Sequence, residues 1–377
     1  MSLVDESLSA GLKRLSESIH SLRELAYEEY GSVEAIDAFL RSEGHATRVG
    51  VGGIRTAFEV LVGPSSPTVA ILAEYDALPE VGHGCGHNLI AMTTVGAFVA
   101  AARSWASADV GLRLIGTPAE EGGGGKIRLL EQGVFEGVAA VISSHPAAES
   151  VWAAGATNLG VVGHEVVYKG LATHASSAPQ AGRNALSALL LAFAGIDAAR
   201  QRLGPDDRIT GIITDGGSAV NVIPARAAGR FGIRSRSAAR IEELVALFEG
   251  IVRGAALQTQ TDVETSETMR LHLPMTPAPW ISESMRRRLR ESGIPPVLDH
   301  HVWASTDLGN VSAVIDTDWL RFPVTEQPIP GHSLAMAEAS LSGLAHANGF
   351  VATEILAGTL LDLAASPSVK GWSGSRP

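Results

Sequence analysis

The stretch TVAILAEYDAL, residues 68–78, begins as an apolar run rich in branched side chains and ends in polar residues. The stretch GLRLIGTPAEE, residues 111–121, has the same form. Between them NLIAMTTVGAFVAAARSWA, residues 88–106, has the spacing and length of a helix. A strand, a helix and a second strand in this order predict a largely parallel sheet covered by helices, and therefore an α/β fold.

A third apolar run, GVAAVISSHPAAE at residues 137–149, repeats this form and delivers His145 at its end. In open α/β sheets, sites form outside the carboxyl ends of the strands. We therefore expect the chemistry at the polar ends of these three runs. Residues 6–43 precede the sheet, and their leucines recur at helical spacing, which predicts a helical start to the domain.

A different alternation starts at about residue 163. Its segments follow the order strand, helix, strand, strand, helix, strand, which is that of a ferredoxin-like unit. We predict an α/β domain made of residues 1–162 and 271–377, interrupted by an inserted ferredoxin-like α+β domain at residues 163–270.

Composition excludes several classes of protein. Lys and Arg number 29 against 40 Asp and Glu, and the resulting net charge of -11 disfavours nucleic acid as a partner. Apolar stretches are too short and too interrupted to span a membrane, which takes about 20 apolar residues. The chain has one cysteine, so it forms no internal disulfide, and we expect a cytoplasmic location.

That cysteine, Cys85, lies in GHGCGHN at residues 82–88, two positions before His87. The surrounding glycines allow both side chains to turn toward one point. Thiolate and imidazole are ligands that suit Zn²⁺ or a related transition-metal ion. The alternative is a buried inert cysteine beside a hydrogen-bonded histidine, because free cysteine is among the most buried residue types.

Two adjacent glutamates, Glu120 and Glu121, follow the second strand and precede a run of glycines. A charged pair at a strand end is costly unless a cation lies close, and a metal ion supplies that charge. One glutamate would then bind the metal while the other holds the attacking water. A solvated acidic pair in a loop is the alternative.

Several motifs occur together and in a fixed order: AEYDALPEVGHGCGHN, GTPAEEGGGGKIRLLEQGVF, SSHP, GLATHASSAP, GGSAVNVIP, STDLGNVS and a late GHS. In the presence and order of these motifs, the chain resembles the M20 family of metallopeptidases and amidohydrolases over about residues 15–360. It looks most like the aminoacylase-1-like, aminobenzoyl-glutamate-hydrolase-like branch. The resemblance implies a catalytic α/β domain with an inserted lid and dimerisation domain.

Carried over to this sequence, the resemblance implies a set of metal ligands: Cys85, His87, Glu121, His145 and His332. These would hold one or two divalent ions, Zn²⁺ or Mn²⁺, with Co²⁺ as a further candidate. Glu120 matches the general base, and Asp76 matches the acid that orients a ligand. His174 is implied to reach the active site of a neighbouring subunit and stabilise the oxyanion there.

Two further residues are implied to contact substrate. Asn221, in NVIP, looks like the contact from the lid, and Arg234 is the candidate for binding a substrate carboxylate. The chain also departs from the family pattern. Glu74 stands where other branches have a histidine ligand, so Cys85 or His87 is expected to take its place, and Asn88 stands where many relatives have aspartate.

These features predict a metal-dependent hydrolase that cleaves an amide bond in an N-acyl or N-aroyl amino acid or a small dipeptide. The expected assembly is a homodimer formed through the inserted domain. Three alternatives stay open: displacement of an amine from an electron-poor aromatic or imine-like carbon, nucleophilic catalysis by Cys85, and a metal- or ligand-binding protein without turnover.

Overall fold

The computed structural model describes residues 2–372 and 374 of the chain. Contacts between backbone segments divide the chain into two compact units. The first unit comprises the chain up to Thr157, Met275–Val302 and the chain from Asp307 onward. The second comprises Asn158–Pro274 together with Trp303–Thr306, and so runs a few residues past both ends of the segment 163–270.

A seven-stranded sheet forms the centre of the first unit, in the order β1-β2-β4-β3-β5-β13-β6. Its strands are β1 (Arg48–Val49), β2 (Phe58–Val62), β3 (Thr68–Ala73), β4 (Gly111–Gly116), β5 (Val138–Ala147), β6 (Ala153–Ala154) and β13 (Asp316–Pro323). The four central strands, β4, β3, β5 and β13, run parallel. Every residue of β3 and β4 is buried, as expected for strands covered on both faces. The largely parallel sheet predicted from the sequence is confirmed.

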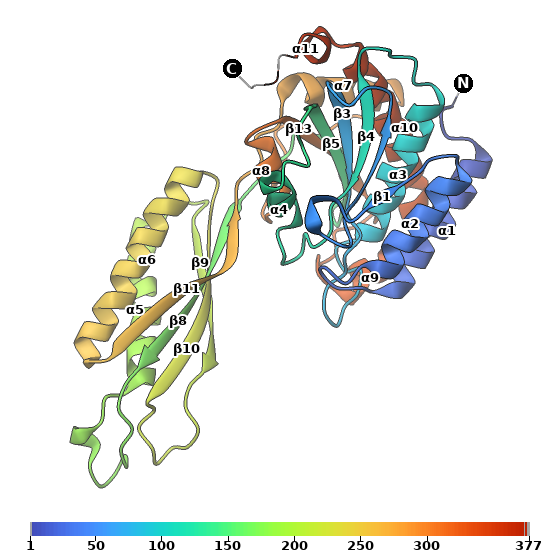
Figure 1. Ribbon diagram of the computed structural model, residues 1–377. Coiled ribbons are helices and arrows are strands. Elements are labelled where there is room, and N and C mark those ends of the chain that lie inside the picture. The colour runs from blue at the N-terminus through green and yellow to red at the C-terminus, as the bar shows by residue number, and fades with distance from the viewer. Residues whose placement is uncertain (1, 373, 375–377) are drawn as a thin grey trace. The chain divides into compact units, whose positions relative to one another are not determined.

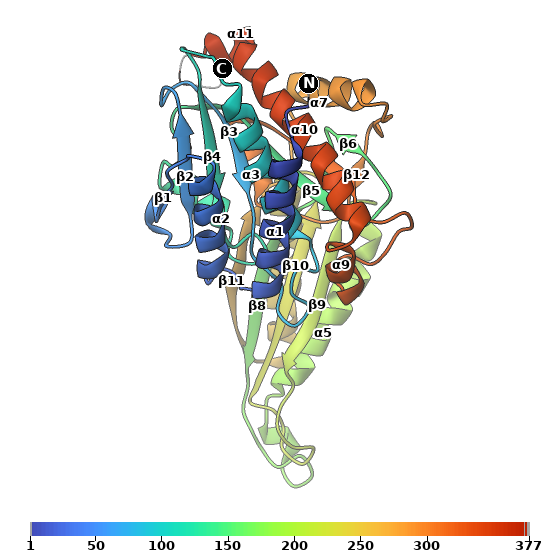
Figure 2. The same cartoon turned by 90° about the vertical axis from the view of Figure 1, so that its right-hand side faces the viewer.

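Helices cover both faces of this sheet (Figures 1 and 2). One face packs against α1 (Glu6–Leu22), α2 (Tyr30–Ser42), α3 (His87–Arg103), α7 (Pro279–Glu291) and α10 (Gly343–Ala365). The other face packs against α4 (Gly125–Glu131) and α8 (Leu308–Ser312). Short helices complete the unit: η1 (Val51–Gly53), α9 (Leu334–Ala339) and α11 (Pro367–Lys370). The leucines of α1 at helical spacing are buried, which confirms the predicted helical start.

The second unit is a four-stranded antiparallel sheet in the order β11-β8-β10-β9. Along the chain its elements are β8 (Gly160–Lys169), α5 (Ala185–Ala199), β9 (Arg208–Asp215), β10 (Arg226–Ser235), α6 (Ala238–Thr259) and β11 (Asp262–His272). Both helices lie on one face of the sheet (Figure 1), where Tyr168, Phe231 and Phe248 are buried between the layers. The predicted ferredoxin-like order of elements is confirmed.

The remaining elements are short: β7 (Thr157–Asn158) pairs with β12 (His301–Val302), and η2 (Pro179–Ala181) and η3 (Arg200–Arg202) are single turns. Within residues 2–372, none of the helices combines the length and the apolar character needed to cross a lipid bilayer.

Candidate metal centre

The candidate site lies in the first unit, where neighbouring parallel strands end. Glu74 and Asp76 follow β3, Glu120 and Glu121 follow β4, and His145 belongs to the last part of β5. Because β4, β3 and β5 are adjacent and parallel, their carboxyl ends meet at one edge of the sheet. The fold thus brings together polar side chains that are distant in the sequence, since Glu74 and His145 are 71 positions apart.

Backbone geometry in the glycine-rich loop carries Cys85 and His87 to this edge. Gly86, between them, has a φ of 80° and immediately precedes α3, which begins at His87. A Cβ atom on Gly86 would lie 2.7 Å from Cγ of Pro146. Glycine is therefore required here both by the left-handed backbone and by the close approach of β5.

All five candidate ligands lie in one cluster. Cys85 Sγ is 3.5 Å from His145 Nε2. Glu121 Oε1 is 3.7 Å from His87 Nε2, and Glu121 Oε2 is 3.7 Å from His332 Nε2. Two groups of donor atoms result, each within 4.8 Å: Cys85 with His87 and His145, and Cys85 with Glu121 and His332.

These spacings fit a divalent metal ion. Ligand atoms at about 2.0 to 2.3 Å from a tetrahedral Zn²⁺ lie roughly 3.3 to 3.8 Å apart, whereas N–H···O hydrogen bonds are shorter. Within the described part of the chain, His87 Nε2 and Glu121 Oε1 are buried and have no hydrogen-bond partner. Buried polar atoms without a partner are costly, and a shared cation would satisfy both.

Asp76 orients two of the candidate ligands. Its Oδ1 lies 2.9 Å from His87 Nδ1, and its Oδ2 accepts a hydrogen bond from the backbone N–H of Glu121 at 2.9 Å. Burial alone would lower the pKa of His87, but the Asp76 carboxylate raises it well above its usual value. With Nδ1 held by Asp76, Nε2 faces the cluster as the ligand atom, an arrangement typical of metal-binding histidines.

The surroundings of His145, a candidate ligand, favour the neutral imidazole. Its Nδ1 lies 2.7 Å from the carbonyl oxygen of Pro146, so Nδ1–H donates and the Nε2 lone pair faces Cys85. Burial, followed by the charge of Arg321, lowers its pKa well below the usual value. A neutral imidazole is the form that binds metals.

The surroundings of Cys85 oppose nucleophilic catalysis. Burial, and then the nearby Glu121 carboxylate, raise the pKa of the thiol well above its usual range. Reactive cysteines have electropositive surroundings that lower the pKa. A bound cation would reverse this effect and deprotonate a coordinating thiol, so the environment suits a ligand rather than a nucleophile.

Glu120 has the surroundings of a proton-transfer group. Its side chain is buried, and burial, followed by the charges of Glu74 and Glu121, raises its pKa well above the usual value. Carboxyl groups that act as general acids and bases have pKa values raised in this direction. Its Oε2 lies 3.8 Å from His87 Nε2, beside the candidate ligands.

The sequence did not point to three further buried charges at this site. Lys126 Nζ lies 2.8 Å from Glu74 Oε1 and 2.6 Å from Asp307 Oδ1. Glu29 Oε1 accepts a hydrogen bond at 2.9 Å from the N–H of Ala119, whose φ of 61° turns the chain just before the glutamate pair. The only local signal for Lys126 is its position after a run of glycines, and this is equally typical of a surface residue.

The candidate substrate residues lie in the second unit. His174 and Asn221 are exposed neighbours, since Ala175 N donates to Asn221 O at 2.9 Å. Arg234 lies at the other end of β10, where it donates to Ser305 Oγ at 2.7 Å. Within that unit His174 and Asn221 are brought together, and Arg234 is apart from them.

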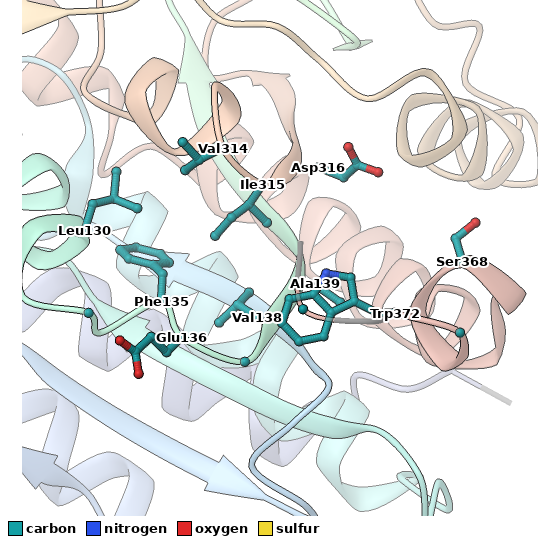
Figure 3. Close-up of a pocket in the computed structure, with 14 residues that line it drawn as sticks. Leu130, Phe135, Glu136, Val138, Ala139, Val314, Ile315, Asp316, Ser368 and Trp372 are labelled. Carbon is teal, nitrogen blue, oxygen red and sulfur yellow. The ribbon is translucent and has the colours of Figure 1, made fainter. Parts of the chain in front are cut away.

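A cavity of about 740 Å³ lies elsewhere in the first unit (Figure 3). Its lining includes Val138, the first residue of β5, and Asp316, the first residue of β13. It therefore opens at the amino ends of these strands, opposite to the cluster. None of the candidate site residues lines it, so the donor chemistry rather than cavity size locates the site.

The chain is similar to known enzymes over nearly its whole length. A mouse Xaa-Arg dipeptidase is 34% identical, with 97% of this chain and 88% of that protein covered. A p-aminobenzoyl-glutamate hydrolase polypeptide of Escherichia coli strain K12 is 32% identical, over 69% of this chain and 59% of that protein. Residues 157–260 match the family model described as peptidase dimerisation domain.

Solved structures share the fold. A dinuclear metal-binding M20 peptidase from Bacillus subtilis has a TM-score of 0.73 at 18% identity, covering 96% of this chain and 99% of that one. An aminobenzoyl-glutamate utilization protein from Klebsiella pneumoniae has a TM-score of 0.71 at 19% identity, covering 95% and 98%. The chain belongs to the M20 family of metal-dependent peptidases and amidohydrolases.

Proposed function

We propose that this enzyme cleaves the amide bond of a dipeptide or an N-acyl or N-aroyl amino acid. The observation that carries the proposal is the position of Glu120, a buried carboxyl group with a raised pKa beside a cluster of metal-binding atoms. The names of the relatives, a dipeptidase and an aminobenzoyl-glutamate hydrolase, support a substrate with an amino acid on one side of the bond.

Each residue in the cluster has a proposed task. Five side chains would hold the metal: Cys85, His87, Glu121, His145 and His332. The metal, when bound, lowers the pKa of water and polarises the substrate carbonyl. Glu120 takes the proton from the attacking water and returns it to the leaving amine, while Asp76 keeps His87 in the required orientation.

We further propose that the cluster would hold two ions, of Zn²⁺ or Mn²⁺. Support comes from the two groups of donor atoms described above, which have only Cys85 in common. A free thiol ligand also suits a reducing, cytoplasmic compartment.

The proposed assembly is a homodimer through the second unit. Strand β9 is at the edge of its sheet and exposes Ile212 and Ile213, and α5 exposes Leu190 and Leu191. An exposed apolar edge strand is a template for pairing with another chain. The match of residues 157–260 to a peptidase dimerisation domain agrees with this.

In this dimer, His174 of one subunit would stabilise the oxyanion formed in the partner's site. Its Nδ1 accepts hydrogen bonds from the backbone N–H groups of Ser176 and Ser177, each at 3.2 Å. The proton of the neutral ring therefore lies on Nε2, which is available as a donor. Asn221 and Arg234 are the proposed contacts to the rest of the substrate.

A turnover screen tests the proposed reaction. Dipeptides, N-acyl amino acids and aminobenzoyl conjugates are incubated with the enzyme after chelation, with and without added Zn²⁺, Mn²⁺ or Co²⁺. We expect release of an amino acid only when metal is supplied. Turnover that survives chelation but is lost on thiol alkylation would instead favour a cysteine nucleophile.

A further inference from the structure

Glu74 has one carboxylate oxygen without a hydrogen-bond partner in the described part of the chain. The side chain is 3% exposed, and Oε2 is buried without a hydrogen-bond partner among the described residues. This oxygen lies 3.6 Å from His87 Nε2, which also has no partner. Glu74, His87 and Glu120 offer three ligand atoms within 4.8 Å of one another.

The other oxygen of Glu74 is fixed by Lys126. The ammonium group is fully buried and lies 2.8 Å from Glu74 Oε1. Asp307 holds this lysine at both ends, because its Oδ1 accepts from Nζ at 2.6 Å and its Oδ2 accepts from the backbone N–H at 2.9 Å. The carboxylate of Glu74 therefore has a defined orientation, with Oε2 directed to the cluster.

The charge balance shows what Oε2 requires. Lys126 is one cation between two carboxyl groups, so it can compensate only one of the two in the trio of Glu74, Lys126 and Asp307. Glu120 and Glu121 add further carboxyl groups on the same side. An isolated buried carboxylate is strongly unfavourable unless a cation or a set of hydrogen bonds compensates it.

We propose that Glu74 Oε2 is a further ligand of the metal bound at His87 Nε2, held in place by Lys126 and Asp307. Its spacing from Nε2 is that of two ligands on one cation, as for the other donor pairs of the cluster. Lys126 acts as a positioning residue: it neutralises Oε1 and leaves Oε2 for the metal. This inference rests on the proposed metal centre and adds a ligand to it.

The direct test is a crystal structure of the wild-type enzyme loaded with Zn²⁺, with the metal located by anomalous scattering. We expect a Glu74 oxygen at about 2.0 to 2.2 Å from a metal that also binds His87. Metal at the cluster with Glu74 Oε2 beyond about 3 Å, for example hydrogen-bonded to a protonated Glu120, would overturn the inference and leave the proposed function standing. Absence of metal from the whole cluster would overturn both.

Variants test the same claim in solution. The Co²⁺ affinity of metal-stripped protein is measured by calorimetry for Glu74→Gln and for the double variant Lys126→Met/Asp307→Asn, which keeps the net charge of the trio. We expect a weakening of about 10- to 100-fold in the double variant, the range for losing a group that supports a metal ligand, and a weakening at least as large in Glu74→Gln, which loses the charged ligand itself. Affinity equal to wild type in Glu74→Gln would contradict the inference.

The matched control is Glu59→Gln. Glu59 is also a largely buried glutamate in an ion pair, with Arg113 at 2.5 Å, but it lies on β2 and contributes to no group of candidate ligands. The control should bind Co²⁺ as the wild type does. Near-ultraviolet circular dichroism of every variant separates a loss of metal binding from a loss of folding.

Discussion

Glu120 and Glu121 are neighbours in the chain, but their surroundings differ. Glu121 bridges toward two histidines, with Oε1 at 3.7 Å from His87 Nε2 and Oε2 at 3.7 Å from His332 Nε2. Glu120 is buried, and its pKa is raised chiefly by that burial. The left-handed backbone at Ala119 and its hydrogen bond to Glu29 set the turn that precedes both. These surroundings support the proposed roles, in which Glu121 binds metal and Glu120 moves a proton.

Replacement of each glutamate by glutamine should therefore affect a different property, kcat for Glu120 and metal affinity for Glu121. Glu120→Gln should keep its metal and lose about 10² to 10⁴ in kcat, because general acid–base action of this kind contributes that factor. Glu121→Gln should lose metal affinity. Metal content by mass spectrometry, measured alongside kcat, separates them, and equal metal content in both variants would contradict this division.

A single buried aspartate gives a pH-dependent contribution to stability. Burial raises the pKa of Asp318 to about 6, above the usual value of 3.8. Below pH 3.8 the Asp318 carboxyl is mostly neutral in both the folded and the unfolded protein. As the pH rises through this window, the unfolded chain loses its proton first, so the free energy of unfolding falls by roughly 3 kcal/mol in total.

Asp318→Asn should remove this fall in the free energy of unfolding, because an amide does not titrate. The amide oxygen can still accept the hydrogen bonds from the backbone N–H groups of Gly155 and Trp319. Urea unfolding of metal-stripped protein at several pH values from 4 to 7.5 measures it. The free energy of unfolding of the variant, relative to that of the wild type, should increase as the pH rises. A constant difference between the two proteins over this range would show that the Asp318 carboxyl is not perturbed.

At the scale of helices and strands, the sequence predicts most of the architecture. Apolar runs correspond to β3, β4 and β5, and the helix-like segment between the first two corresponds to α3. Their polar ends indicated where the cluster would form, because adjacent parallel strands end together. Burial on both faces of the sheet makes these signals strong.

The sequence could not predict the trio of Glu74, Lys126 and Asp307. Glu74 directly follows β3, and the family resemblance indicated only a missing histidine there. Lys126 lies near the start of the short helix α4, where a lysine is commonly solvated. Its burial depends on Asp307, 181 positions later in the chain, and this contact exists only once the sheet has assembled both segments. Long-range ion pairs of this kind leave no local pattern.

The edge strand β9 provides a test of the proposed dimer. Ile212 is 62% exposed, and its replacement by glutamate places a charge where an apolar edge would pair. Light scattering should find Ile212→Glu as a monomer. Leu257→Glu on α6, at a site 81% exposed, is the control and should remain a dimer. A dimeric Ile212→Glu would exclude β9 from the interface.

For the whole molecule, the proposed assembly makes each active site depend on two chains. His174→Ala and Glu120→Gln should each be inactive as pure dimers. In a mixed dimer, one site would have both wild-type residues, so activity should partly return after subunits exchange. Exchange is followed with differently tagged chains, and demonstrated exchange without recovery of activity would show that His174 does not act across the interface.

Titration of metal-stripped enzyme with Co²⁺ tests whether the Cys85 cluster binds the metal on which catalysis depends. Hydrolysis of a dipeptide substrate and the near-ultraviolet thiolate-to-cobalt absorption are recorded in the same samples. We expect no turnover without metal, and turnover that rises together with an absorption band that is absent from Cys85→Ser. Full turnover in stripped enzyme, or a band unchanged in Cys85→Ser, would contradict this expectation.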